Sequence, residues 1–306
     1  MLSIPIHAGK LQLANRLVMP PLATENCTDG MVTENLITHY EKRAGKIGLI
    51  ICEHAYIEAK GQASKGQLRL DHKADMDGLK ELVKRVHVKG QTKIVQQISH
   101  CGDLSRVVKD RTPVNDLTLD DMKRIKQAFV EAALRVKEAG FDGVEVHAAH
   151  GYLLSQFYSP LTNQREGSYG SSPENRLRFI LEVIADVRKA VGADYPLLVR
   201  FGGCDYKEGG SDKKDVPHSS KFIQETGCDL LDISGGLNGF LVKGAESDTF
   251  VELSQLAKQT VDIPVLVAGG IRGKEHMNEL LAQGACDLIG YGRPLMKDVS
   301  EIDLLL

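Results

Sequence analysis

The sequence is poor in the features that mark several classes of protein. Its six cysteines include no Cys-x-x-Cys pair, and no cysteine–histidine spacing matches a zinc site. We therefore expect reduced thiols in a cytoplasmic protein. No apolar run approaches the ~20 residues that a membrane span needs, and the N-terminal stretch carries Lys10 and Arg16 without the apolar core of a signal peptide.

The chain also has little excess charge of either sign. The 38 lysines and arginines nearly balance the 41 acidic residues, for a net charge of −3, so neither nucleic acid nor an anionic membrane is an expected partner. A dinucleotide-binding fingerprint is also missing, because the glycines at 235–239 have the wrong spacing and no acidic residue follows ~20 positions later. We expect these glycines to form a flexible rim over the mouth of the fold. A nicotinamide cofactor would then bind there only transiently and dissociate after use.

Short apolar runs alternate with helix-like segments along the chain. Unbroken runs rich in branched residues fit strands that are buried on both faces. Eight such strands are expected, at 16–19, 48–52, 93–98, 143–146, 197–200, 230–233, 265–268 and 288–291. Seven helices are expected between them, at 33–43, 75–87, 118–138, 172–191, 217–226, 250–260 and 275–283.

This alternation implies parallel strands with right-handed crossovers, and eight units close into a (β/α)8 barrel. An open doubly wound sheet is the alternative, but it usually has about five or six strands. We expect one α/β domain over residues 1–306, with a short hairpin at 4–13 as a floor under the barrel. Residues 293–306 leave room only for a truncated last helix.

Three polar side chains follow the expected strand at 143–146, where a barrel keeps its chemistry. His147 and His150 suit either a metal pair or two donors that hold a substrate oxygen. No carboxylate with ligand-like spacing stands beside them, so we expect no metal, although either histidine alone is more simply a packing residue. Tyr152 suits a general acid. A long polar loop is expected after it, up to the helix that begins at 172.

The last two expected strands end in glycine-rich loops, a common phosphate site in barrels. Gly269 and Gly270 follow one strand, and Gly292 and Arg293 follow the other. Glycine lets a backbone approach a phosphate closely, and arginine adds a charge-assisted contact. The alternative is that these glycines only turn tight corners.

Two further polar residues, Gln97 and Arg200, lie at the ends of strands that should point into the barrel mouth. A buried arginine needs an anionic or strongly accepting partner, and the pyrimidine edge of a flavin is one. The alternatives are an ion pair of Arg200 with Asp232 or Glu145, and a core amide at Gln97 that is satisfied by its neighbours.

Together these motifs resemble the Old Yellow Enzyme family, the NADH:flavin oxidoreductases, over nearly the whole chain. The resemblance rests on NRLVMPP at 15–21, residues 48–53, HAAHGYLLSQFYSPLTNQREGSYGSSPENRLRF at 147–179, VAGGI at 267–271 and GYGRPL at 290–295. It implies a barrel with non-covalent FMN. It also implies an ene-reductase that uses NAD(P)H to reduce the C=C bond of small α,β-unsaturated carbonyl compounds, by ping-pong hydride transfer through flavin N5.

The resemblance also assigns roles by position. His147 and His150 would hydrogen-bond the substrate carbonyl, and Tyr152 would protonate Cα. The residues implied to bind FMN are Pro20, Pro21, Leu22 and Ala23 along the flavin, Gln97 and Arg200 at its pyrimidine edge, and Gly269, Gly270, Gly292 and Arg293 at its phosphate.

The sequence departs from the family pattern in several places. Ala23, with Thr24 beside it, stands where the family often has threonine or cysteine, and the segments at 102–118 and 239–249 are short. Larger relatives continue into iron–sulfur and nucleotide-binding modules, for which we expect no counterpart here. A paralogue that binds FMN with little turnover and a flavin-free, phosphate-binding lyase are the alternatives. The physiological acceptor, the choice of NADH or NADPH and assembly into a homo-oligomer stay open.

Overall fold

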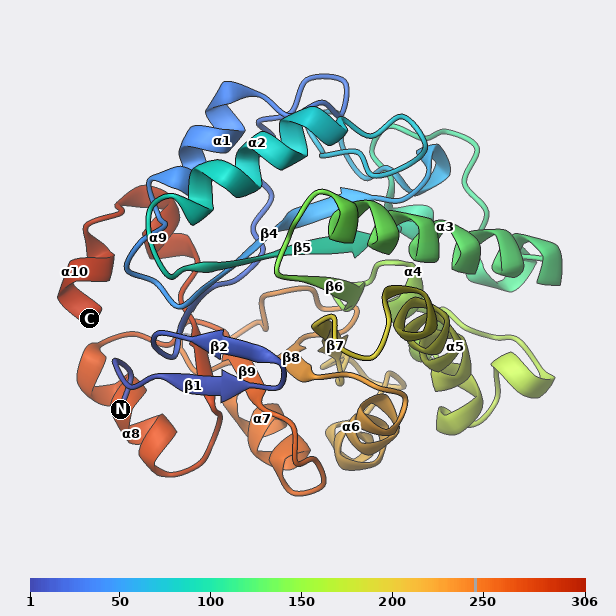
Figure 1. The fold of residues 1–306 in the computed structure, drawn as a ribbon. Coiled ribbons are helices and arrows are strands. Elements are labelled where there is room, and N and C mark those ends of the chain that lie inside the picture. The colour runs from blue at the N-terminus through green and yellow to red at the C-terminus, as the bar shows by residue number, and fades with distance from the viewer. Residues whose placement is uncertain (245–246) are drawn as a thin grey trace.

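The computed structural model describes residues 1–244 and 247–306; part of the short segment expected at 239–249 therefore lies outside the described residues. Eight parallel strands close into a barrel in the order β10-β3-β4-β5-β6-β7-β8-β9 (Figure 1). They are β3 (Leu17–Met19), β4 (Leu49–Tyr56), β5 (Lys93–Ser99), β6 (Gly143–Ala148), β7 (Leu197–Gly202), β8 (Leu230–Ser234), β9 (Val265–Ala268) and β10 (Leu288–Gly290). The predicted (β/α)8 barrel is confirmed.

Helices surround the barrel, and side-chain caps begin three of them at the positions where helices were expected to start. Thr33, Thr118 and Ser172 each accept a hydrogen bond from a backbone N–H of the first turn. The main helices are α1 (Glu34–Glu41), α2 (Met76–His87), α3 (Leu119–Glu138), α5 (Pro173–Val191), α6 (Val216–Glu225), α7 (Val251–Lys258) and α8 (Lys274–Ala282). Two short helices, α9 (Arg293–Lys297) and α10 (Glu301–Leu305), follow β10, where a single truncated helix was expected.

An N-terminal hairpin closes the bottom of the barrel. Strands β1 (Ile6–Ala8) and β2 (Leu11–Leu13) pair antiparallel. Their buried residues pack against inward-pointing residues of the barrel, among them Val18, Leu49 and Leu230. At the tip, Gly9 has φ +60°, and a Cβ there would lie 2.5 Å from the carbonyl oxygen of Asp229. The predicted floor is therefore present, and the open end of the barrel is the opposite one.

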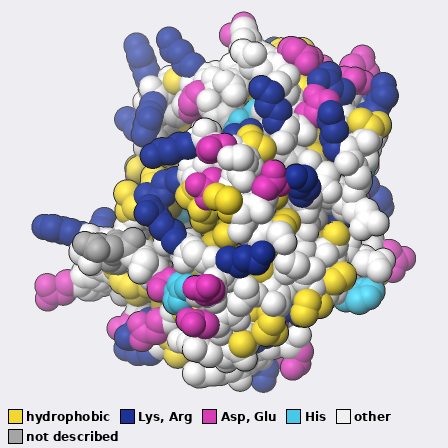
Figure 2. Space-filling model, turned by 90° about the vertical axis from the view of Figure 1, so that its left-hand side faces the viewer, with side chains coloured by type: hydrophobic (Ala, Val, Ile, Leu, Met, Phe, Trp, Pro, Cys, Tyr) yellow, Lys and Arg dark blue, Asp and Glu magenta, His cyan; other side chains and the backbone are white. Residues whose placement is uncertain are grey.

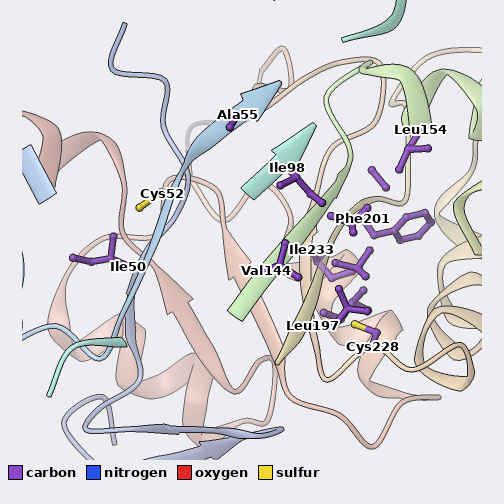
Figure 3. Close-up of a cluster of buried hydrophobic side chains, with 14 of the residues drawn as sticks. Ile50, Cys52, Ala55, Ile98, Val144, Leu154, Leu197, Phe201, Cys228 and Ile233 are labelled. Carbon is purple, nitrogen blue, oxygen red and sulfur yellow. The ribbon is translucent and has the colours of Figure 1, made fainter. Parts of the chain in front are cut away.

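The alternate residues of each strand explain why its apolar run is unbroken. Leu49 and Ile51 of β4 belong to the cluster inside the barrel, whereas Ile50 and Cys52 belong to the cluster between barrel and helices. Figure 3 shows Ile50 and Cys52 on the same side of β4. Both faces of the strand are buried, so both sets of positions are apolar.

None of the helices in residues 1–244 and 247–306 is both long and apolar enough to cross a bilayer. On the face that Figure 2 shows, lysine and arginine side chains are interspersed with acidic ones, and hydrophobic side chains lie in small groups among them.

The polar loop expected directly after Tyr152 is the main error of the prediction. Residues Leu153–Tyr158 form a helix, α4, in which every residue is buried. Its polar side chains are satisfied inside the protein: Gln156 Nε2 donates to the carbonyl oxygens of Cys101 and Gly151. A helix this short and buried on all sides has no polar face, so it lacks the periodicity by which helices are recognised.

Candidate active site

One cavity of about 700 Å³ lies at the carboxyl ends of the barrel strands. Every candidate site residue from the sequence lines it: Pro20, Pro21, Leu22, Ala23, Gln97, His147, His150, Tyr152, Arg200, Gly269, Gly270, Gly292 and Arg293. The structure thus brings the two histidines and the tyrosine into the same space as both glycine-rich loops.

Closure of the barrel places segments from near the two ends of the chain side by side at this cavity. Strands β3 and β10 are neighbours, and Tyr291 N donates to Val18 O. The proline-containing segment after β3 therefore lies against the loop after β10. A Cβ on Gly292 would lie 3.1 Å from Pro20 Cγ and from Leu22 Cδ1.

The glycine-rich loops use glycine for two physical reasons. Gly270 has φ +83°, a left-handed conformation that glycine adopts at little cost. At Gly290, a Cβ would lie 2.6 Å from the Cβ of Ala268 on the neighbouring strand. The strand ends and their backbone groups can approach closely here only because these side chains are missing.

The two predicted histidines contact each other. His147 Nε2 lies 3.1 Å from His150 Nδ1, and His150 Nε2 lies 2.7 Å from Ser234 Oγ. His147 is the penultimate residue of β6, a strand longer than predicted. His150 is held at φ +60° by its backbone N–H, which donates to Gly235 O. Strained backbone of this kind is common at functional sites.

Burial keeps the histidine pair neutral. It lowers the pKa of His147 well below its ordinary value, and the nearby His150, His54 and Arg200 lower it further. Burial, together with Arg200 and His54, does the same to the pKa of His150. No cluster of three or more potential metal ligands occurs among residues 1–244 and 247–306. At neutral pH the pair therefore offers ring N–H groups as hydrogen-bond donors.

Tyr152 lies edge-on against the ring of His147, with a centroid distance of 4.9 Å. Burial is the main reason that the pKa of Tyr152 is raised to about 12. The hydroxyl therefore keeps its proton at neutral pH, and it faces the cavity that the histidine pair lines. This arrangement suits a proton donor.

Gln97 and Arg200 have the partners that were weighed as alternatives to a flavin. Gln97 Nε2 donates to Glu145 Oε1 at 2.7 Å, and Arg200 Nε lies 3.2 Å from Asp232 Oδ2. Burial raises the pKa of Glu145 well above its ordinary value and that of Asp232 to about 6. Within the described part of the chain, Arg200 Nε makes no aligned hydrogen bond. Both residues also line the cavity, so these contacts and a ligand are compatible.

The sequence reading missed several residues of the cavity wall: Glu25, His54, Arg106, Ser234, Phe240 and Arg272. His54 is the most informative of these. The predicted strand stopped at 52, whereas β4 continues to Tyr56, so His54 lies on its carboxyl end. The available signal was its type, because it is a histidine near the end of a buried strand.

Comparisons with known proteins agree with this geometry. The family model described as the NADH:flavin oxidoreductase / NADH oxidase family matches residues 2–301. The chain is 38% identical to an NADH oxidase of Thermoanaerobacter brockii over 95% of this chain and 48% of that protein. It is 34% identical to an NADPH dehydrogenase of Bacillus subtilis over 96% of this chain and 90% of that protein.

Two solved structures are similar to the whole chain. Morphinone reductase, as a mutant in complex with tetrahydroNAD, has a TM-score of 0.83 at 25% identity, over 98% of this chain and 89% of that one. A 2-naphthoyl-CoA reductase in complex with 2-naphthoyl-CoA has a TM-score of 0.91 at 25% identity, over 99% of this chain and 51% of that one. The chain thus spans about half the length of the NADH oxidase and of the naphthoyl-CoA reductase.

Proposed function

Because the chain belongs to the NADH:flavin oxidoreductase / NADH oxidase family, an Old Yellow Enzyme-type family, we propose that it reduces the C=C bond of small α,β-unsaturated carbonyl compounds with NAD(P)H. The family and its NADPH dehydrogenase members imply a non-covalent FMN, with NAD(P)H as the hydride donor. The observation that carries the proposal is that one cavity holds a neutral histidine pair, a protonated tyrosine and two glycine-rich loops.

The residues of the cavity fit FMN. A volume of about 700 Å³ lies within the range of cofactor sites. Gly269, Gly270, Gly292 and Arg293 would hold the phosphate, with the close backbone approach that Gly290 permits. Gln97 and Arg200 would face the pyrimidine edge, and residues 20–23 would lie along the ring. When bound, FMN supplies hydride transfer between NAD(P)H and the acceptor.

His147 and His150 would bind the carbonyl oxygen of the acceptor. His147 Nε2 and His150 Nδ1 are 3.1 Å apart, so one of them donates to the other in this structure. When the Ser234 hydroxyl donates to His150 Nε2, Nδ1 carries the hydrogen, and a carbonyl oxygen beside the pair would accept from both N–H groups. Donors fixed in a cavity stabilise the negative charge that develops on this oxygen. This polarisation makes Cβ a better hydride acceptor.

Tyr152 would complete the reduction. As hydride reaches Cβ, the O–H bond of Tyr152 breaks and a Cα–H bond forms, so the acceptor gains two electrons and two hydrogens. The resulting phenolate recovers its proton from water in the open cavity. A lyase with a Schiff-base lysine is a weaker candidate, because no lysine is among the described residues that line the cavity.

The test begins with the purified protein, which should be yellow and release its chromophore on heating. Anaerobic NADH or NADPH should bleach it. Tyr152→Phe should leave this bleaching nearly unchanged and slow the reduction of 2-cyclohexenone about 10²-fold or more, the usual contribution of a general acid. A colourless protein that fails to bind FMN would refute the proposal, and equal loss of both half-reactions would refute the role of Tyr152.

A further inference from the structure

His54 is a cavity residue to which the proposed function gives no role. It lies near the carboxyl end of β4 and lines the cavity beside Tyr152. Its ring stacks on that of His147, with a centroid distance of 6.2 Å and an interplanar angle of 19°. It meets Tyr152 edge-on at 5.2 Å. His54 is thus in contact with both the carbonyl-binding pair and the proton donor.

Gln67 determines which nitrogen of His54 carries the proton. The backbone N–H of Ala63 donates to Gln67 Oε1 at 2.7 Å, which fixes the orientation of this buried amide. Gln67 Nε2 then faces the carbonyl oxygen of His54 at 3.2 Å and its Nδ1 at 2.7 Å. An amide nitrogen has only hydrogens to offer, so Nδ1 must be the acceptor. The neutral ring therefore carries its hydrogen on Nε2.

The protonated nitrogen faces Tyr152. His54 Nε2 lies 3.5 Å from the Tyr152 hydroxyl oxygen, and such contacts are often long before substrate binds. Burial lowers the pKa of His54 to about 4, so the ring is neutral at neutral pH and keeps the single hydrogen that the contact with Gln67 assigns to Nε2. Since Nε2 is a donor, the tyrosine oxygen accepts from it and remains free to give its own hydrogen to another group.

We infer that His54 is a positioning residue for Tyr152: its Nε2–H donates to the phenol oxygen, aims the hydroxyl hydrogen at the acceptor and stabilises the phenolate left after proton transfer. The inference rests on the proposed function. In the step itself the Tyr152 O–H bond breaks, the Cα–H bond forms and His54 keeps its proton. A hydrogen bond to a charged oxygen is roughly twice as strong as one to a neutral oxygen. The contact therefore favours the transition state over the ground state.

The first test separates hydrogen bonding from packing. His54→Phe keeps a ring but removes the N–H, and His54→Gln returns an N–H at about the same distance from the backbone. His54→Phe should slow acceptor reduction by the holoenzyme, reduced with whichever of NADH and NADPH bleaches it, about tenfold or more. It should change flavin reduction by less than about twofold. His54→Gln should recover most of the rate. His72→Phe, at an exposed histidine, is the matched control and should change neither half-reaction.

Two further measurements exclude a merely structural role. In a Tyr152→Phe background, His54→Phe should cause no further loss, because the two residues act as one unit. In the ¹⁵N spectrum of histidine-labelled holoenzyme, the His54 signals are those that disappear in His54→Phe. Near neutral pH these signals should show that Nε2 is protonated and Nδ1 is not.

The outcomes distinguish this inference from the proposed function. If Tyr152→Phe leaves acceptor reduction unchanged, the role of Tyr152 fails and the inference with it. If Tyr152→Phe slows acceptor reduction but His54→Phe reduces the acceptor as fast as the unaltered enzyme, only the role inferred for His54 fails. A full additional loss in the double variant, or a proton on Nδ1, would also overturn the inference alone.

Discussion

Burial keeps the two histidines and the tyrosine of the cavity uncharged at neutral pH. The pKa values of His147 and His150 are lowered, and that of Tyr152 is raised to about 12. All three groups can therefore donate a hydrogen bond at neutral pH without first changing charge. Burial is the largest cause at all three groups, and the charge of Arg200 lowers the pKa of both histidines further. No local motif in the sequence reveals which residues surround these groups.

A buried carboxyl group near this cavity should make stability depend on pH. Glu53 is buried and accepts hydrogen bonds from Thr24 and Tyr40, yet burial raises its pKa to about 7. The folded state then binds a proton that the unfolded state has lost above its ordinary pKa of 4.5. The contribution of Glu53 to stability is therefore full below pH 4.5 and declines as the pH rises through 7.

Glu53→Gln should remove this dependence. Urea unfolding at pH 5 to 8 should show a decline for the unaltered protein that is steeper than that of the variant, by up to about 3 kcal/mol over the range. The exposed Glu166 supplies the control, because Glu166→Gln should leave the slope unchanged. Parallel pH profiles for the protein and Glu53→Gln would contradict the prediction.

At the scale of elements, the sequence predicts the scaffold better than the ends of its strands. Apolar runs and caps such as Thr118 locate the barrel strands and the main helices because both signals are local. The strand ends are polar and belong to the site, so β4 and β6 run past their predicted limits and carry His54 and His147. The buried helix α4 was missed for a different reason: it has no polar face and therefore no helical periodicity.

A side chain at Gly290 should disrupt the close approach of the ends of β9 and β10. In Gly290→Ala, the new Cβ would lie 2.6 Å from the Cβ of Ala268, so the two strand ends must separate and the glycine-rich loops that follow them must move. We expect FMN affinity to fall at least about tenfold, because the loss of one hydrogen bond to the charged phosphate costs roughly 1.5–3 kcal/mol. Fluorescence quenching of FMN titrated with apoprotein measures it.

Gly284→Ala is the control for this prediction. Gly284 has φ +69° and open space around it, so alanine there is strained without a clash. It should lower the free energy of unfolding by about 1 kcal/mol and leave FMN affinity unchanged. If Gly290→Ala bound FMN as tightly as Gly284→Ala, the loops would not depend on the close approach of these strands.

At the scale of the whole molecule, the barrel assembles the site from the two ends of the chain. Pro20 and Gly292 come close together because β3 and β10 pair when the barrel closes. That proximity was predictable only after the fold class was known, since no local pattern links positions so far apart. The open shape of the cavity and the direct contact of His54 with Tyr152 depend on side-chain packing and could not be predicted from the sequence.

In the proposed binding mode, FMN would contact residues from both ends of the chain, so its binding should stabilise the whole barrel. A ligand that binds only the folded state at 100 times its Kd adds about 2.7 kcal/mol. We expect FMN to raise the melting temperature of the apoprotein, measured by circular dichroism. Riboflavin, which lacks the phosphate, should raise it less at the same concentration, because it forfeits the charge-assisted contacts of the glycine-rich loops.

Arg293→Gln should reduce the difference in binding affinity between FMN and riboflavin. It removes the charged contact expected at the phosphate, worth roughly 1.5–3 kcal/mol, while riboflavin binding makes no use of that contact. FMN affinity should therefore fall about tenfold or more, and riboflavin affinity should stay within about twofold. Arg178, an exposed arginine on α5, serves as control through Arg178→Gln. Equal losses for FMN and riboflavin would place the phosphate away from Arg293, and an unchanged FMN affinity would mean that the backbone of the loops holds it alone.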